Sequence, residues 1–108
     1  MQRTCFTFEV VPGQEQEYDR RHREVWPELV AELRAAGVSN YTIFRRGRTV
    51  IAYAECEPDA ATSFGRVAQT DANQRWNDWF SGVLAGLPGD DGSLSTVPEV
   101  WHLPESGQ

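Results

Sequence analysis

Hydrophobic residues change their spacing several times along the chain, and the order of these changes limits the folds available to it. Over residues 4–11 apolar and polar side chains alternate, which predicts a half-buried strand. From 14 to 36 apolar residues recur every three or four positions, which is typical of a helix with one buried face. Pro27 lies inside this stretch and lacks a backbone N–H, so we expect it to kink or divide the helix near residues 23–26.

The rest of the chain continues this change between strand and helix spacing. The expected elements are a strand over 40–45, a turn at 46–48, a strand over 49–55, a helix over 58–69 that starts with Pro58, a helix over 71–84 capped by Thr70 or Asp71, and a last strand over 97–103. The order β-α-β-β-α-β is that of α+β, ferredoxin-like folds, in which a four-stranded antiparallel sheet carries helices on one face. A second copy packed against the other face would cover it, so a homodimer is predicted. The polar, glycine-rich loop over 86–96 is long enough to act as a lid.

Length and composition exclude several classes of protein. The chain has 108 residues, which suits one domain at 1–104 followed by a flexible tail at 105–108. Its ten basic residues, all arginine, stand against sixteen acidic ones and leave a net charge of −6, which disfavours binding to nucleic acid. No run of about 18 apolar residues could span a membrane, and the first residues lack the apolar core of a secretion signal. A cytoplasmic protein is therefore predicted, in which Cys5 and Cys56 are two buried thiols.

Any chemistry must be carried by ordinary side chains. The histidines and cysteines show no metal-ligand spacing, and no phosphate-binding loop occurs, so neither a metal nor a cofactor is predicted. His22 follows Tyr18 by one helical turn on the apolar stripe, and Tyr41 opens the next strand. The imidazole is either a buried structural group or a proton donor and acceptor near neutral pH. The two tyrosines are either core residues with bonded hydroxyls or ligands of a polyhydroxylated molecule.

Three large aromatic residues, Trp76, Trp79 and Phe80, follow within two turns of the last predicted helix. They either fill the core and a dimer contact, or present one ring to a pocket, where a flat ring suits the C–H face of a sugar. The charged residues between 15 and 24 are expected to form a solvated helix face with weak local ion pairs. His102 is expected to be solvated or structural.

Several segments together carry a resemblance to a known family. They are EYDRRH at 17–22, WPEL at 26–29, Gly37 with NYTIF at 40–44, TD at 70–71, QRW at 74–76 and EVWHLP at 99–104. In order and spacing they resemble the L-rhamnose mutarotase family over roughly residues 3 to 104. The resemblance implies a dimeric α/β barrel and a cofactor-free enzyme that interconverts the α and β anomers of a 6-deoxy sugar.

The resemblance also implies roles for individual residues. His22 matches the family's proton donor, and Tyr18, Tyr41 and Trp76 match its sugar-binding residues. Asn77 stands where the family often has a second tryptophan, so the pocket wall is smaller and more polar, and L-fucose is an alternative substrate to L-rhamnose. Two other functions stay open: a cofactor-independent or haem-degrading monooxygenase of the same dimeric architecture, and a non-catalytic metabolite-binding module.

Overall fold

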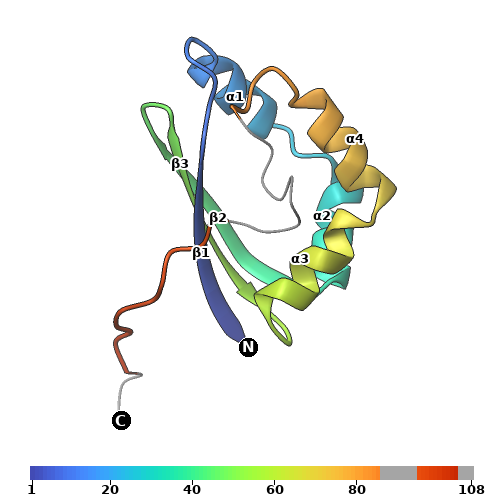
Figure 1. Ribbon diagram of the computed structural model, residues 1–108. Coiled ribbons are helices and arrows are strands. Elements are labelled where there is room, and N and C mark those ends of the chain that lie inside the picture. Colours follow the sequence, from blue (N-terminus) through green and yellow to red (C-terminus); the bar gives the residue numbers. More distant parts are fainter. Residues whose placement is uncertain (86–94, 105–108) are drawn as a thin grey trace.

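The computed structural model describes residues 1–85 and 95–104 (Figure 1). Its elements are β1 (Gln2–Glu9), α1 (Glu15–His22), α2 (Pro27–Ala35), β2 (Val38–Arg46), β3 (Thr49–Cys56), α3 (Ala60–Ala68) and α4 (Asp71–Trp79). The tail predicted at 105–108 and most of the lid predicted at 86–96 lie outside the described residues. None of these helices is long and apolar enough to cross a membrane.

The three strands form one antiparallel sheet in the order β1-β3-β2. β2 and β3 form the predicted hairpin, whose turn contains Gly47 with a φ of +59°. Alternate residues of β3, from Val50 to Cys56, are buried against the helices because side chains along a strand point to opposite faces. The alternation predicted for the first strand is confirmed, since Phe6 and Val10 are buried on the same side.

All four helices lie on one face of the sheet (Figure 1). The predicted division of the 14–36 stretch is confirmed, because α1 ends at His22 and Pro27 is the first residue of α2. Trp26 takes an extended backbone conformation, as the proline ring disfavours helical geometry in the residue before it. Gly37 follows α2 with a φ of +96°, and a Cβ at this position would lie 2.1 Å from the backbone oxygen of Glu57, so only glycine fits.

The helix predicted over 58–69 begins later than expected. Asp59, and not Pro58, precedes the helix, and its carboxylate accepts a hydrogen bond of 2.8 Å from the backbone N–H of Thr62. Such a cap satisfies one of the free N–H groups of the first turn, which fixes the start of α3 at Ala60.

The helix predicted over 71–84 ends earlier than expected. Thr70 caps its start as predicted, with its hydroxyl oxygen accepting from the N–H of Asn73 at 3.2 Å. α4 stops at Trp79 because the residues that follow bond to the end of β1 instead. The N–H of Val11 donates to Val83 O at 2.7 Å, and that of Ala85 to Glu9 O at 2.9 Å.

The fourth strand predicted over 97–103 does not form. An isolated bridge joins Thr96 to β1, but Pro98 has no N–H with which to extend the pairing. Beyond this point the chain leaves the sheet on the side away from the helices (Figure 1), and Val100 and Trp101 are 96% and 72% exposed. The α+β class is confirmed, but the described part of the chain forms a sheet of three strands and not four.

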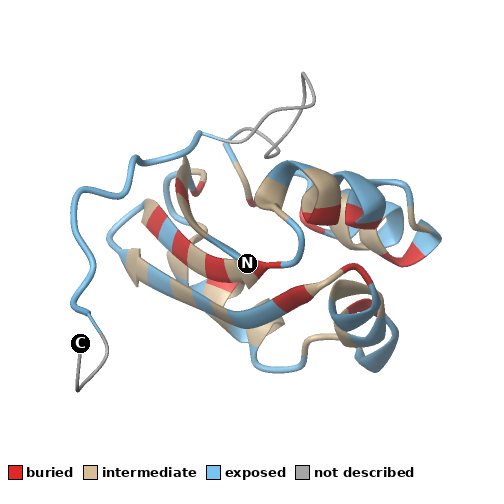
Figure 2. Cartoon of the chain, turned by 90° about the horizontal axis from the view of Figure 1, so that it is seen from below, coloured by how far each residue is buried: buried red, intermediate tan, exposed pale blue. Residues whose placement is uncertain are grey.

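The core lies between the sheet and the helices, where buried residues gather (Figure 2). One buried group contains Val10, Tyr18, Val50, Phe80 and Val83, and the other contains Val38, Ala54 and Cys56. The two cysteines are free thiols. The prediction of buried thiols is right for Cys56 and wrong for Cys5, which is only half-buried because it lies on the opposite face of the sheet.

The sheet face away from the helices is open in the described part of the chain. Phe44 and Ile51 are partners across β2 and β3 on this face. Their side chains are 61% and 36% exposed. Val100 and Trp101 of the segment that follows the sheet are exposed as well.

Candidate active site

Helix α1 brings Tyr18 and His22 together, as their spacing predicts. The centroids of the two rings are 4.3 Å apart, and Nδ1 of His22 lies 3.1 Å from the backbone oxygen of Tyr18. A carbonyl oxygen can only accept, so Nδ1 carries the proton and donates this hydrogen bond. The other ring nitrogen, Nε2, is thereby left to gain or lose a proton.

The surroundings of His22 lower the pKa of its imidazole below the usual 6.5. The largest cause is burial, which disfavours the charged ring, while the hydrogen bond to the Tyr18 carbonyl and the nearby Asp19 carboxylate act in the opposite direction. At neutral pH the ring is therefore mainly neutral. A group of this kind can exchange protons with a bound molecule in both directions.

The hydroxyl group of Tyr18 is buried without a hydrogen-bond partner among the described residues. Burial raises the pKa of this phenol above its usual value, with smaller contributions from Tyr41 and Asp19, so the hydroxyl keeps its proton. A buried polar atom left unpaired is uncommon in folded proteins and costs free energy. A hydroxyl group on a bound ligand would supply the missing partner.

Helix α4 builds an aromatic wall beside His22. The ring of Trp76 stands edge-on to the imidazole with 5.4 Å between centroids, and the ring of Phe80 lies 5.1 Å away. Trp79 stacks instead on Trp26 at 5.4 Å and is 36% exposed. Of the three aromatic residues singled out in the sequence, Trp76 is therefore the one presented to the site, and Phe80 belongs to the core.

Arg21 joins α1 to the end of α4. Its guanidinium donates to the backbone oxygen of Trp79 and lies 5.0 Å from the centroid of that residue's ring. Glu17 accepts from Arg21 at 2.6 Å and from Arg20, and these bonds lower the pKa of Glu17 to about 2. Arg21 donates to a backbone carbonyl that the end of the neighbouring helix leaves free. The prediction of a solvated helix face between residues 15 and 24 is therefore wrong for this residue.

Arg75 joins α4 to α2. It donates two hydrogen bonds to the carboxylate of Glu28, at 2.9 and 2.8 Å, and a third to Asp71 at 2.8 Å. Its guanidinium also lies 5.7 Å from the ring of Trp26. The residue before Trp76 thus fixes the helix that carries the aromatic wall.

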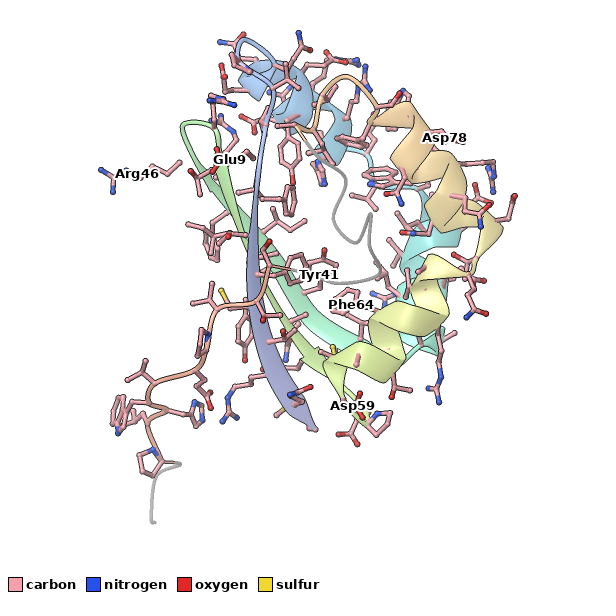
Figure 3. All side chains as sticks on the ribbon, viewed as in Figure 1. Glu9, Tyr41, Arg46, Asp59, Phe64 and Asp78 are labelled. Atoms are coloured by element: carbon pink, nitrogen blue, oxygen red, sulfur yellow. The ribbon has the colours of Figure 1, made fainter. Side chains whose placement is uncertain are left out.

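Tyr41 reaches the same cleft from the sheet. A bulge in β2 between Ser39 and Thr42 inserts one extra residue opposite β3. Val38 before the bulge and Tyr41 after it consequently both face the helices. Tyr41 packs against Phe64 of α3 at 5.8 Å between ring centroids (Figure 3), and burial raises the pKa of its phenol above the usual value.

The four residues singled out in the sequence line one cleft of about 1530 Å³ between the sheet and the helices. Tyr18, His22 and Trp76 form a contiguous group at one end, and Tyr41 packs with Phe64 at the other. Phe6 and Phe8 of β1 connect the two groups. In the described residues no group of three His, Cys, Asp or Glu side chains is placed to hold a metal ion.

A second ionic contact lies beside the site, and no pattern in the sequence indicated it. Arg45 of β2 binds the carboxylate of Asp19 through two hydrogen bonds of 2.8 and 2.6 Å. This pair borders a smaller hollow of about 490 Å³, which Tyr18 and His22 also line. The imidazole therefore lies between the hollow and the main cleft. The two partners are 26 positions apart, so no local pattern could reveal them.

Comparison with known proteins gives consistent matches over the whole chain. The family model described as L-rhamnose mutarotase matches residues 3–103. The L-rhamnose mutarotase of Shigella flexneri serotype 5b is 36% identical over 104 residues, which cover 96% of this chain and 100% of the relative. That of Oceanobacillus iheyensis is also 36% identical, covering 95% and 99% of the two chains.

Solved structures agree with the sequence matches. The crystal structure of L-rhamnose mutarotase from Formosa agariphila superposes with a TM-score of 0.78 at 25% identity, covering 96% of this chain and 100% of the other. Tetracenomycin F2 cyclase from Streptomyces glaucescens superposes with a TM-score of 0.61 at 20% identity over 96% and 100% of the two chains. The second likeness shows a shared fold alone.

Proposed function

We propose that this chain, which belongs to the L-rhamnose mutarotase family, is an isomerase that interconverts the α and β anomers of L-rhamnose or a closely related sugar such as L-fucose. One observation of the site carries the proposal. The rings of Tyr18 and His22 lie 4.3 Å apart between centroids, the Tyr18 hydroxyl has no partner among the described residues, and the imidazole lies edge-on to the ring of Trp76. This arrangement offers proton transfer, a hydrogen bond and a flat apolar surface to one small polar ligand.

Exchange of anomers requires two proton transfers and no net consumption of protons. The pyranose opens when the ring oxygen gains a proton and the anomeric hydroxyl loses one, which gives the open-chain aldehyde. Closure on the other face of the carbonyl reverses both transfers. Both can be performed by side chains and water, so the proposal requires no cofactor.

His22 is the proton donor in this scheme. The bond from Nδ1 to the Tyr18 carbonyl fixes the ring. In the fraction of molecules whose imidazole is protonated, Nε2 delivers its proton to the ring oxygen and recovers one on closure. Water or a tyrosine hydroxyl handles the anomeric proton. Tyr18 keeps its own proton because of its raised pKa, so it serves as a hydrogen-bond donor or relay. Positioned acid–base groups of this kind contribute a rate factor of roughly 10² to 10⁴.

Trp76 and the tyrosines hold the sugar in this scheme. The ring of Trp76 supplies a flat surface for the C–H face of the pyranose, next to the imidazole that reacts. Tyr18 and Tyr41 supply hydroxyl groups from the helix side and from the sheet side of the cleft. The enzyme therefore binds its substrate between the two layers of the fold.

A homodimer in the cytoplasm completes the proposal. Phe44 and Ile51 on the open sheet face, together with the exposed Val100 and Trp101, supply apolar surface that a second copy would bury. Free thiols at Cys5 and Cys56 suit a reducing compartment. Size-exclusion chromatography with light scattering tests the dimer, and a monomer at all concentrations would contradict it.

Saturation-transfer NMR of anomer exchange tests the activity. We expect α–β exchange of L-rhamnose, with L-fucose measured alongside, to become faster in proportion to the protein concentration. A folded protein that accelerates neither of these sugars nor any of a wider panel would overturn the proposed function.

A further inference from the structure

Two asparagines of α4 face the cleft next to the proposed reaction centre. Asn73 and Asn77 are half-buried, line the cleft with Trp76, and stand one helical turn apart. The backbone N–H of Asn73 bonds to the Thr70 cap. Neither side-chain amide has a hydrogen-bond partner in the part of the chain that the structure describes, and the cleft is the space into which both can donate and accept.

The chemistry of an amide suits a hydroxyl group. Each carboxamide offers two donors and an acceptor, and each sugar hydroxyl is both donor and acceptor. Two amides at this spacing can therefore bind a hydroxyl from two sides. An apolar group placed against them would displace water without replacing its hydrogen bonds, which is unfavourable.

The position of the pair relative to His22 identifies the part of the sugar that it meets. His22 is proposed to protonate the ring oxygen, which is bonded to C1 and to C5, so the anomeric hydroxyl and the substituent of C5 each lie two bonds from the reacting atom. The anomeric hydroxyl is assigned above to water or a tyrosine hydroxyl, which leaves the substituent of C5 for the wall on α4. The ring centroids of Trp76 and His22 are 5.4 Å apart, and Asn77 is the next residue along the helix. The wall nearest to that substituent is therefore the one formed by Trp76 and the two amides.

We propose that Asn73 and Asn77 form a hydroxyl-binding pair that selects sugars with a hydroxymethyl group on C5 over sugars with a methyl group. This inference rests on the proposed function and names the substrate class of the same site. L-Rhamnose carries a methyl group at this position, whereas L-mannose has the same ring configuration and a hydroxyl group on C6. A site that offers hydrogen bonds discriminates against an analogue that lacks the matching hydroxyl.

Three sugars and three variants test the inference. L-Mannose, L-rhamnose and L-lyxose share the ring configuration and carry CH2OH, CH3 and H on C5, and their exchange is measured by the same NMR experiment. Asn73→Leu and Asn77→Leu remove each amide at similar size, and Gln74→Leu changes an exposed residue of the same helix as the matched control. Circular dichroism and thermal unfolding establish that each variant is folded.

We expect the native protein to exchange L-mannose more efficiently than L-rhamnose or L-lyxose, by kcat/KM. Each asparagine variant should lower the ratio of L-mannose to L-rhamnose by about two- to tenfold, the range that corresponds to one neutral hydrogen bond. Gln74→Leu should leave the ratio unchanged. If a variant does not fold, the kcat/KM values of the three sugars on the native protein still test the inference.

The possible failures are distinguishable. Accelerated exchange of L-rhamnose overturns the role of the amides, and leaves the proposed function intact, if L-mannose is exchanged no more efficiently than L-rhamnose. The same holds if the ratio of the two sugars is unchanged in both folded asparagine variants. No acceleration of these three sugars or of L-fucose by folded native protein overturns the proposed function itself.

Discussion

The two ends of the cleft differ in the side chains that form them and in how those side chains interact. At the His22 end, Arg21 fixes the contact between α1 and α4, and a buried hydroxyl of Tyr18 has no partner in the described chain. At the Tyr41 end, aromatic rings of β1, β2 and α3 pack on one another, with Tyr41 in contact with Phe6 and Phe64. At the His22 end a buried hydroxyl is available to a ligand, and leaving it unpaired lowers the free energy of unfolding. At the Tyr41 end the packed rings determine the shape of the cleft.

Replacement of His22 should have the largest effect of any single change. We expect His22→Ala to reduce the rate of anomer exchange by roughly 10² to 10⁴ while the protein remains folded, because the proposed proton donor is lost. His102→Ala is the matched control, since this second histidine is exposed and is not among the residues that line the cleft. Near-native exchange by folded His22→Ala protein, measured by saturation-transfer NMR, would remove the residue from the mechanism.

The contacts of Arg21 at the His22 end should also contribute to the free energy of unfolding. Arg21 and Arg20 both bind Glu17, but Arg21 is the more buried and also donates to the Trp79 carbonyl. We expect Arg21→Ala to lower the free energy of unfolding by about 1–2 kcal/mol, the range of a partly exposed hydrogen bond to a charged group. Arg20→Ala should lower the free energy of unfolding much less, because an ion pair of an exposed arginine contributes little to stability. Equal losses in urea unfolding of the two variants would contradict the special role of Arg21.

Removal of each tyrosine hydroxyl compares the two ends directly. Tyr18→Phe should raise the free energy of unfolding by about 1 kcal/mol, because it removes a buried polar atom that has no partner among the described residues. The same change should slow anomer exchange. Tyr41→Phe should leave stability nearly unchanged and raise the KM for the sugar. Should Tyr18→Phe destabilise the protein, its hydroxyl must have a partner in the folded state.

The smallest expected effect concerns pH. Burial lowers the pKa of His22 below 6.5, so the protonated ring is lost, and exchange should slow, as pH rises through a midpoint below that value. Asp19 raises the pKa of His22, while Arg45 on β2 partly neutralises that carboxylate, and the faces of Trp76 and Phe80 carry no charge. Asp19→Asn should therefore move the midpoint slightly further toward low pH. A rate that increases with pH through the same midpoint would instead identify the neutral ring as a base.

Local patterns predicted much of this fold correctly. The alternation over 4–11, the break before Pro27 and the contact between Tyr18 and His22 all depend on residues close in sequence, where periodicity and proline geometry act directly. The strand over 97–103 was a wrong prediction because alternation does not reveal whether an edge can continue past Pro98. The end of α4 depends on bonds between residues 83–85 and the region after β1, which are distant in sequence.

The site itself was less accessible from local patterns. The contacts of Arg21 with Trp79, of Arg75 with Glu28 and of Asp19 with Arg45 join separate elements and leave no mark in spacing. The roles of His22, Tyr18, Tyr41 and Trp76 came from the family resemblance and stay predictions until variants are measured.

The bulge in β2 decides which of the side chains beyond it face the helices. Before the bulge even-numbered residues such as Val38 face the helices, and after it odd-numbered residues such as Tyr41 and Ile43 do so. If β2 paired regularly from Val38 onward, with no extra residue at the bulge, Phe44 would face the cleft and Tyr41 would face away from it. Loss of the bulge without loss of a residue would therefore alter the ligand surface and the open face at once, whereas a substitution changes one of them at a time.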